Sequence, residues 1–204
     1  MTIAYEYRPG VLYLNVTNRC SNDCGFCVRQ GPGFSLGGVD MRLETEPTVD
    51  EVKEAIGAAE RERKRGRAFD EVVFCGFGEP TYRLRLIGEV GRWLRDRGVA
   101  VRLNTNGQAA LLNRRDVREI VDVVAGAVNT VSISLNAPTA AQYEELCEPA
   151  FGEGTFEAVV EFAQTCVGRV DRVVLTVVGF TLDDEAIHRC EDLAAELGAD
   201  FRVR

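Results

Sequence analysis

The sequence contains very little histidine, and this scarcity limits the chemistry that its 204 residues can support. The single histidine, His188, falls in a stretch whose periodicity predicts a surface helix. Serine–histidine triads and metal sites built from histidines are therefore close to excluded. Acidic residues outnumber lysine and arginine, and the resulting net charge of −8 argues against general nucleic-acid binding. Catalysis would have to depend on cysteines, carboxylates, arginines or a bound cofactor.

Long apolar runs are missing as well, which argues against a membrane protein. No uninterrupted apolar segment approaches the roughly 20 residues of a membrane-spanning helix. The first residues, Met1 to Tyr7, lack the basic region and apolar core of a secretory signal peptide. The seven cysteines are odd in number and lack the arrangement of a secreted disulfide framework. We therefore expect a protein of the reducing cytoplasm.

Three of the seven cysteines lie close together, and this group is the strongest chemical signal in the sequence. Cys20, Cys24 and Cys27 follow the spacing C-x3-C-x2-C. Thiolates bind soft metals, and iron–sulfur clusters above all. Three thiolates would leave one iron of a four-iron cluster open to a small molecule. A structural zinc site is the alternative, but such sites normally use four ligands in two pairs, and no second pair follows.

Alternating strand and helix periodicities predict an α/β fold with a parallel sheet, in a single domain over residues 1–204. Six βα units are fewer than the eight of a closed TIM barrel. The expected strands cover residues 11–17, 71–75, 99–103, 130–135, 172–178 and 201–203. The expected helices cover residues 49–65, 84–97, 116–125, 139–146, 156–166 and 183–197.

Several expected strands carry polar side chains on one face, which is unusual for the buried strands of a parallel sheet. Side chains alternate along a strand, so the polar residues face one side and the apolar residues the other. The apolar face suits packing against helices, and the polar face suits a wet or ligand-filled interior. The alternative is that the polar groups only satisfy neighbouring backbone atoms. The polar positions are Asn15, Thr17, Arg102, Asn104, Ser132, Ser134, Asn136, Thr176, Arg202 and Arg204.

Three further motifs stand at the carboxyl ends of expected strands, where the active sites of barrel enzymes gather. Residues 75–81 read Cys-Gly-Phe-Gly-Glu-Pro-Thr, residues 104–107 read Asn-Thr-Asn-Gly, and residues 131–136 read Val-Ser-Ile-Ser-Leu-Asn. Gly-x-Gly after a strand would alone suggest a dinucleotide fold, but the third glycine is missing and Pro80 follows. An ordinary turn between strand and helix is the other alternative.

Taken in this order, the motifs resemble those of the radical SAM superfamily, and most of all the short TatD-associated radical SAM proteins. The cysteine motif has the family's spacing and its aromatic residue, Phe26, before the last cysteine. Residues 76–80 resemble a G-G-E-P segment with Phe77 inserted. The resemblance implies an open partial (β/α)6 barrel, a [4Fe–4S] cluster on the three cysteines, and S-adenosylmethionine. It also implies contacts to S-adenosylmethionine from Phe26, Gly76, Gly78, Glu79, Asn104, Thr105, Ser134 and Asn136.

The family assigns these contacts to particular parts of S-adenosylmethionine. Glycine at positions 76 and 78 would let the backbone approach the amino group, and Glu79 would contact the ammonium. The ends of the third and fourth strands, including Ser134 and Asn136, would contact the methionine carboxylate and the ribose. The segment around Phe26 would meet the adenine.

The same resemblance implies an enzyme, an oxidoreductase or a lyase, that reductively cleaves S-adenosylmethionine to a 5′-deoxyadenosyl radical. This radical would abstract hydrogen from a substrate, and a reductant such as flavodoxin or ferredoxin would supply the electron. Neither the substrate nor the residues that act on it are readable from the sequence. Two alternatives stay open: a non-enzymatic iron–sulfur electron carrier, and an activating enzyme for a glycyl-radical partner protein.

Four cysteines lie outside the motif. Cys166 and Cys190 fall in expected helices and suit burial as small apolar side chains. Cys75 and Cys147 lie nearer the strand ends, where either could donate a hydrogen atom or act as an extra ligand. Inert packing is the simpler interpretation of both. Residues 31–47 form an expected glycine-rich loop that could cover a substrate.

The cysteine spacing predicts iron binding. Anaerobic reconstitution should load about four irons per chain and give a broad brown absorbance. Changing Cys20, Cys24 or Cys27 to Ala should abolish both, because each change removes one thiolate ligand. Cys166→Ala and Cys190→Ala are the controls and should load normally. Iron analysis and the visible spectrum make the measurement, and stoichiometric zinc without iron uptake would contradict the prediction.

Overall fold

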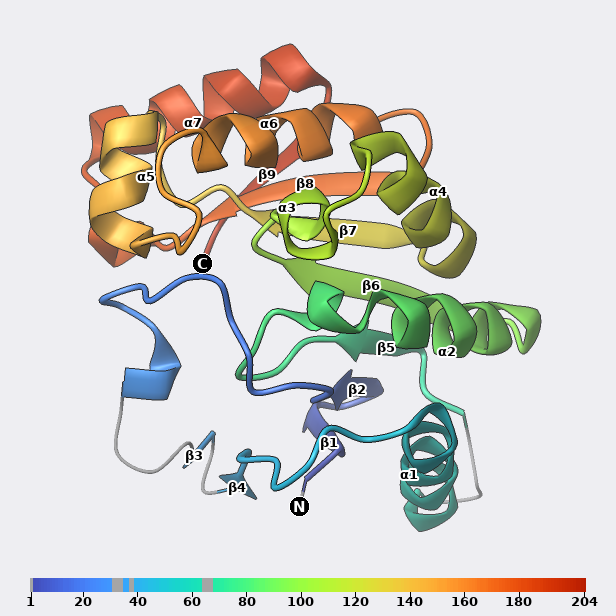
Figure 1. Cartoon of the computed structure of the whole chain (residues 1–204). Helices are drawn as coiled ribbons and strands as arrows, with labels where there is room; N and C mark the ends of the chain where they lie inside the picture. Colours follow the sequence, from blue (N-terminus) through green and yellow to red (C-terminus); the bar gives the residue numbers. More distant parts are fainter. Residues whose placement is uncertain (1, 31–34, 37–38, 64–67) are drawn as a thin grey trace.

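Six parallel strands form the body of the sheet, and they are the six that the sequence predicts (Figure 1). The computed structural model describes residues 2–30, 35–36, 39–63 and 68–204. Within these residues the parallel strands pair in chain order, so each crossover leads to the neighbouring strand. They are β2 (Val11–Leu14), β5 (Glu71–Phe74), β6 (Ala100–Thr105), β7 (Thr130–Ser134), β8 (Arg172–Val177) and β9 (Asp200–Val203).

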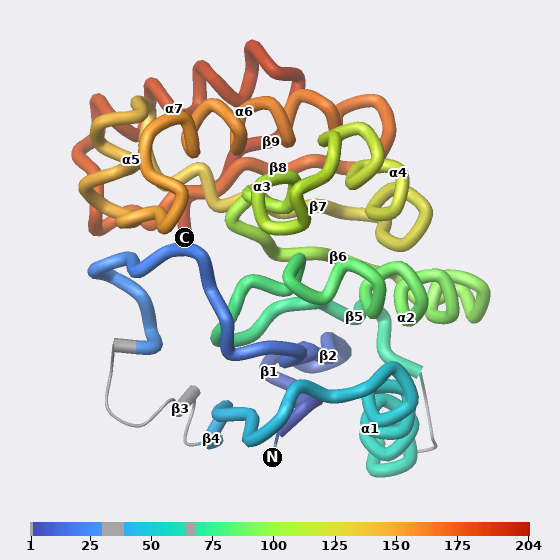
Figure 2. The backbone as a smooth tube through the Cα atoms, in the orientation of Figure 1, coloured from blue at the N-terminus to red at the C-terminus, as the bar shows by residue number. Residues whose placement is uncertain are grey.

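A seventh strand, not predicted from the sequence, lies at the edge of the sheet. β1 (Ala4–Arg8) pairs antiparallel with β2, with Tyr5 opposite Tyr13. Gly10 makes the turn between them in a left-handed conformation, φ 84°, and its N–H donates to Glu6 Oε1 at 2.7 Å. The expectation of parallel strands throughout is therefore corrected at this edge. β1 and β9 form opposite edges and do not pair within the described chain, so the sheet is open (Figure 2).

Helices cover one face of the sheet (Figure 1). Thr48 caps α1 (Val49–Glu62) and forms a capping box with Glu51. The predicted end of this helix at residue 65 falls among residues 64–67, outside the described residues. None of the described helices has the length and apolar character needed to cross a membrane. The others are α2 (Leu84–Asp96), α3 (Ala109–Asn113), which was not predicted, α4 (Val117–Ala127), α5 (Ala140–Cys147), α6 (Thr155–Cys166) and α7 (Asp184–Leu197).

The two faces of the sheet differ as the alternation predicts. Apolar strand residues such as Leu14 and Leu103 enter the core beneath the helices. Polar residues such as Asn104 and Ser134 line a cavity on the other side. Val203 is an exception, because it is 46% exposed although the alternation placed it against the helices. The helices thus cover one face. On the other face a cavity lies at the strand ends, whereas Asn15 and Thr176 are buried and donate to backbone carbonyls.

The loop after β2 carries the cysteines across the carboxyl ends of the strands and reaches α5. The N–H of Asp23 donates to the carbonyl of Cys147 at 3.0 Å, and an isolated antiparallel bridge joins Asn22 to Pro149. Figure 2 shows this blue segment passing beneath α5, near the C-terminal end of the trace. Of the expected loop over residues 31–47, residues 31–34 and 37–38 lie outside the described residues. Its described parts include β3 (Ser35–Leu36) and β4 (Val39–Asp40), which pair as a separate two-stranded sheet.

Close packing between α2 and α4 predicts opposite effects for two glycines. A Cβ added at Gly91 on α2 would lie 2.8 Å from the Cβ of Ala127 on α4. Gly91→Ala should therefore lower the free energy of unfolding by about 1–3 kcal/mol through overpacking. Gly126 on α4 is exposed, with no atom within 4 Å of an added Cβ. Gly126→Ala should raise the free energy of unfolding by roughly 0.5–1 kcal/mol. Urea denaturation measures both, and equal effects would contradict the packing argument.

Candidate functional site

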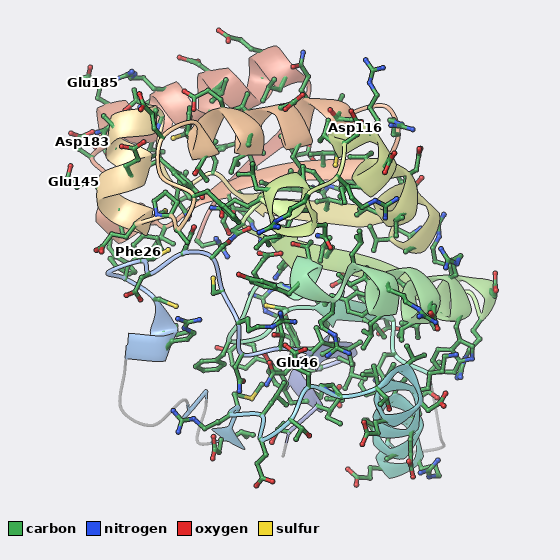
Figure 3. The ribbon with its side chains drawn as sticks, in the orientation of Figure 1. Phe26, Glu46, Asp116, Glu145, Asp183 and Glu185 are labelled. Atoms are coloured by element: carbon green, nitrogen blue, oxygen red, sulfur yellow. The ribbon has the colours of Figure 1, made fainter. Side chains whose placement is uncertain are left out.

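The carboxyl ends of the strands border a cavity of about 200 Å³ that brings the predicted site residues together. The loop after β2 supplies Cys20, Cys24, Phe26 and Cys27. The turn after β5 supplies Gly76, Gly78 and Glu79. The ends of β6 and β7 supply Asn104, Thr105, Ser134 and Asn136. Figure 3 labels Phe26 on the loop that runs below α5. The predicted site residues therefore lie around one cavity. The contact that each would make with S-adenosylmethionine stays a prediction.

The three cysteines of the motif are half-buried and form no disulfide. The N–H of Cys27 donates to the carbonyl of Cys24 at 3.0 Å, which closes a tight turn between them. Burial raises the pKa of the Cys20 thiol to about 11, and a hydrogen bond with Cys147 raises the pKa of Cys24. Among the described residues, no three His, Cys, Asp or Glu side chains lie close enough to hold a metal ion. The thiols thus share a cavity without converging on one point.

The protein's own packing requires the two glycines of the turn after β5. A Cβ at Gly76 would lie 3.0 Å from Cγ of Asn15, and a Cβ at Gly78 would lie 2.9 Å from the carbonyl carbon of Thr17. The space beside both glycines is therefore filled by the segment that leads from β2 to the cysteines. This packing is a reason for glycine that was not predicted, and the expected close approach of S-adenosylmethionine to the same residues stays a prediction. The missing side chains let the turn pack against the cysteine loop.

Glu79 is buried and joins three segments. Its Oε1 accepts hydrogen bonds from the N–H and hydroxyl of Thr81, at 3.0 and 2.7 Å, and from the hydroxyl of Thr105 at 2.7 Å. Its Oε2 accepts from the N–H of Asn106 at 2.6 Å, and its own N–H donates to the carbonyl of Arg19 at 2.7 Å. Burial raises the pKa of this carboxyl group, and the hydrogen bonds oppose the rise. Glu79 therefore positions the loops, a role that was not predicted.

Two buried amide oxygens beside the cavity lack a hydrogen-bond partner in the described structure. They are Oδ1 of Asn104 and Oδ1 of Asn136, and both side chains line the cavity. Asn136 also adopts a left-handed backbone conformation, φ 60°, which non-glycine residues seldom use. Its Nδ2 donates to Sγ of Cys147 at 3.4 Å. Buried acceptors normally have donors, so a ligand with N–H or O–H groups would complete these two.

A buried polar network, not predicted from the sequence, supports the cysteine loop. Gln108 Nε2 donates to Asn22 Oδ1 at 2.6 Å and to the hydroxyl of Tyr143 at 2.9 Å. Asn22 Nδ2 donates to the same hydroxyl at 3.1 Å. Asn106 Nδ2 donates to Ser21 Oγ at 2.8 Å. These partners are far apart in the chain, and no local pattern marks them before the strands and α5 come together.

The cysteines outside the motif differ in their surroundings. Cys166 and Cys190 are fully buried among apolar residues, as predicted. Cys75 lines the cavity, and burial raises the pKa of its thiol. Cys147 is fully buried and shares a hydrogen bond with Cys24. Cys75 and Cys147 therefore lie beside the predicted site, and neither has a defined role there.

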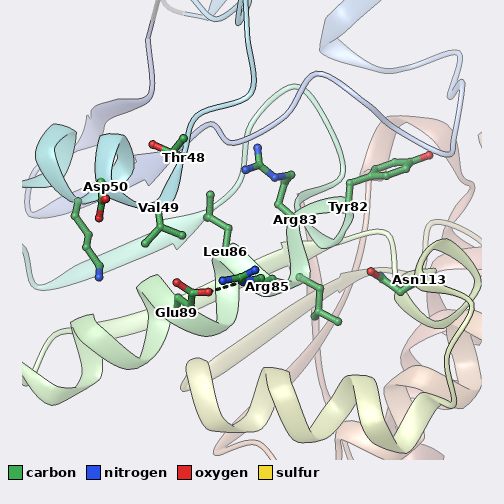
Figure 4. Close-up of a pocket in the computed structure, with 11 residues that line it drawn as sticks. Thr48, Val49, Asp50, Tyr82, Arg83, Arg85, Leu86, Glu89 and Asn113 are labelled. Atoms are coloured by element: carbon green, nitrogen blue, oxygen red, sulfur yellow. Dashed lines mark hydrogen bonds and ion pairs between the residues drawn. The ribbon is translucent and has the colours of Figure 1, made fainter.

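A larger cavity, of about 600 Å³, lies between the start of α1 and the start of α2 (Figure 4). It contains none of the predicted site residues. Several of its charged groups already have partners: Arg85 pairs with Glu89 at 2.7 Å, and Arg83 donates to the carbonyls of Val16 and Pro47. Size therefore does not identify the functional site here, and the cavity beside the cysteines is the better candidate.

Comparisons with known proteins agree with the motifs. Residues 14–194 match the Radical SAM superfamily. A probable GTP 3′,8-cyclase from Halobacterium salinarum is 30% identical over 148 residues, which is 72% of this chain and 36% of that protein. A 5-amino-6-(D-ribitylamino)uracil–L-tyrosine 4-hydroxyphenyl transferase from Methanoculleus marisnigri is 31% identical over 121 residues, or 56% of this chain and 29% of that protein. The chain thus spans about a third of the length of these relatives.

Solved structures share the fold at low sequence identity. TYW1 with a bound lysine–pyruvate adduct gives a TM-score of 0.61 at 15% identity, over 95% of this chain and 64% of that one. SuiB from Streptococcus suis, bound to S-adenosylmethionine, gives a TM-score of 0.64 at 18% identity, over 95% of this chain and 37% of that one. At these identities the similarity concerns the fold alone, and it agrees with an open partial barrel.

The hydrogen bonds of Glu79 predict a stability defect when its charge is removed. Glu79→Gln replaces one carboxylate oxygen with an NH₂ group, which cannot accept from Asn106 or from Thr81 and Thr105. The free energy of unfolding should fall by about 1.5–3 kcal/mol. Glu144→Gln, on the exposed side of α5, is the control and should change it by less than about 0.5 kcal/mol. Chemical denaturation compares the two, and equal stability would refute the role assigned to Glu79.

Proposed function

Because the chain belongs to the radical SAM superfamily, we propose that Cys20, Cys24 and Cys27 bind a [4Fe–4S] cluster and that the adjoining cavity binds S-adenosylmethionine. When bound, these cofactors supply a 5′-deoxyadenosyl radical that abstracts hydrogen from a substrate. The cavity itself carries this proposal, because it gathers three cysteines that form no disulfide and two amide oxygens without a hydrogen-bond partner at the same strand ends.

The donor set fits an iron–sulfur cluster. Thiolates are the usual protein ligands of such clusters, and three of them leave a coordination position for a small molecule. Cys20, Cys24 and Cys27 form no disulfide and are partly exposed, so all three are accessible to iron. To bind a cluster, the three thiols must move closer to one another within the cavity that they line.

The residues at the strand ends supply groups that S-adenosylmethionine needs. Its ammonium and its ribose hydroxyls are donors, and Oδ1 of Asn104 and Oδ1 of Asn136 are buried acceptors without a donor. We assign these two oxygens, with Ser134, to the ribose and the methionine end. Phe26 offers an aromatic surface to the adenine. Glu79 holds the turns that carry these groups, and the residue also lines the cavity.

A non-enzymatic iron–sulfur electron carrier is the competing proposal. A carrier needs a cluster, but it needs no unpaired acceptors for a second ligand.

The proposed enzyme would take its electron from a reductant such as flavodoxin or ferredoxin. Its cysteines form no disulfide, which suits the reducing cytoplasm. Our proposal treats residues 1–204 as a single catalytic domain. The substrates named for the longer relatives are not transferred to this chain.

Product analysis tests the proposal. Reconstituted protein reduced with dithionite should convert S-adenosylmethionine to 5′-deoxyadenosine, slowly without a substrate. Asn136→Gly removes the amide while keeping a residue suited to φ 60°. It should weaken S-adenosylmethionine binding roughly two- to tenfold, because losing a hydrogen bond from a neutral ribose hydroxyl costs about 0.5–1.5 kcal/mol. A binding titration beside the product assay makes the measurement.

Arg114→Gly is the matched control, since Arg114 is exposed and also left-handed, with φ 50°. It should bind S-adenosylmethionine like the wild type. If cluster-loaded wild type neither binds nor cleaves S-adenosylmethionine, the electron-carrier proposal replaces the enzyme. If it cleaves while Asn136→Gly binds equally well, only the assignment of Asn136 is wrong.

A further inference from the structure

A second cavity, of about 350 Å³, lies on the polar face of the sheet and concentrates positive charge. Four arginines line it, although the chain as a whole has a net charge of −8. They come from the two edges of the sheet and from its middle strand. They line the same cavity because the sheet curves. They are Arg8 on β1, Arg102 on β6, Arg202 on β9 and Arg204 just after β9.

Few carboxylates compensate these charges. Glu71 pairs with Arg102 at 3.0 Å, and in the described part of the chain no carboxylate pairs with the other three arginines. Asp200, the nearest acidic residue on β9, is already paired with Arg172 at 2.6 Å. Partial burial and the neighbouring Arg102 and Arg8 lower the pKa of Arg202. Like charges therefore oppose one another here, and an anion would relieve the repulsion.

An unpaired hydrogen-bond donor belongs to one of the arginines that line this cavity. Nε of Arg102 is buried and has no hydrogen-bond partner in the described structure, and the side chain is only 12% exposed. A buried guanidinium N–H without an acceptor costs stability unless a ligand accepts it. Tyr13, stacked on Tyr5 with ring centroids 5.5 Å apart, adds an aromatic wall. Charge and an unpaired donor thus point to the same kind of ligand.

The arginine cavity adjoins the cysteine cavity. Asn104 and Arg204 line both, and Arg204 Nη2 donates to Ser134 Oγ at 3.0 Å. A molecule held by the arginines would therefore extend toward Cys75 and the residues assigned to S-adenosylmethionine. This adjacency connects the charge to the chemistry, because a substrate must approach the cofactor from the accessible side of the sheet.

We infer that the substrate carries a phosphate or carboxylate group and that Arg102, Arg202 and Arg204 bind it. Guanidinium groups bind either oxyanion through paired N–H donors, so both share one recognition chemistry. That the bound anion belongs to the substrate rests on the function proposed above. The anion site itself requires neither the cluster nor S-adenosylmethionine.

Calorimetric titration of the purified chain with inorganic phosphate, and separately with malonate, tests the site at low ionic strength. The wild type should bind at least one of them, and the tighter of the two identifies the source of the charge. Arg202→Gln and Arg204→Gln should each weaken this binding at least tenfold. Both lack a carboxylate partner in the described structure, so their replacement leaves no buried acid unpaired. Arg85→Gln, at a 93% exposed side chain, is the control and should bind like the wild type.

Two results overturn the inference: neither anion binds the wild type, or Arg202→Gln and Arg204→Gln bind as tightly as Arg85→Gln. Cleavage of S-adenosylmethionine is assayed separately on reconstituted wild type. Cleavage without anion binding refutes the arginine site and leaves the proposed function intact. Anion binding without cleavage refutes the proposed function and leaves the arginine site as a binding site.

Discussion

The candidate site depends on one buried carboxylate. A buried charge is costly unless hydrogen bonds replace its water, and Glu79 satisfies this condition with four donated bonds. The donors belong to the turn after β5 and the end of β6, while its own N–H reaches the loop after β2. A parallel sheet brings these three segments to one edge but does not align them. Glu79 supplies the alignment, and the shape of the cavity follows from it.

The cysteine loop is held from its other side by a second acidic residue. Glu46, labelled in Figure 3, pairs with Arg19 at 2.7 Å and accepts from the hydroxyl of Thr17 at 2.5 Å. These bonds tie the residues before the first cysteine to the chain that enters α1. Gly78 completes the arrangement, since only a residue without a side chain fits against the carbonyl of Thr17. Two carboxylates and two glycines therefore position a loop whose own sequence is mostly polar.

Much of this arrangement could be predicted from the sequence, for identifiable physical reasons. The strands and helices follow from periodicity, and the motif residues meet because parallel strands end at the same edge. β1 was missed although the sequence carries a signal for it, since Tyr5 and Tyr7 alternate with polar residues before a Pro9-Gly10 turn. The partners of Glu79 and the contacts among Asn22, Gln108 and Tyr143 also depend on distant segments. Their side chains could be read from the sequence, but their contacts could not.

The separation between the two cavities follows from the geometry of a strand. Residues two apart share a face but lie at different heights, so Arg102 and Asn104 point into the same interior at successive levels. The same holds for Arg202 on β9 and Arg204 just after it, at one edge of the sheet. Asn104 lines both cavities, whereas Arg102 lines only the one with concentrated charge. Height along the strand therefore divides the interior into the level at the strand ends, where we propose that the cofactors bind, and a charged level below it. A substrate anchored by its anionic group at the lower level would present its uncharged part to the upper one, where hydrogen abstraction would take place.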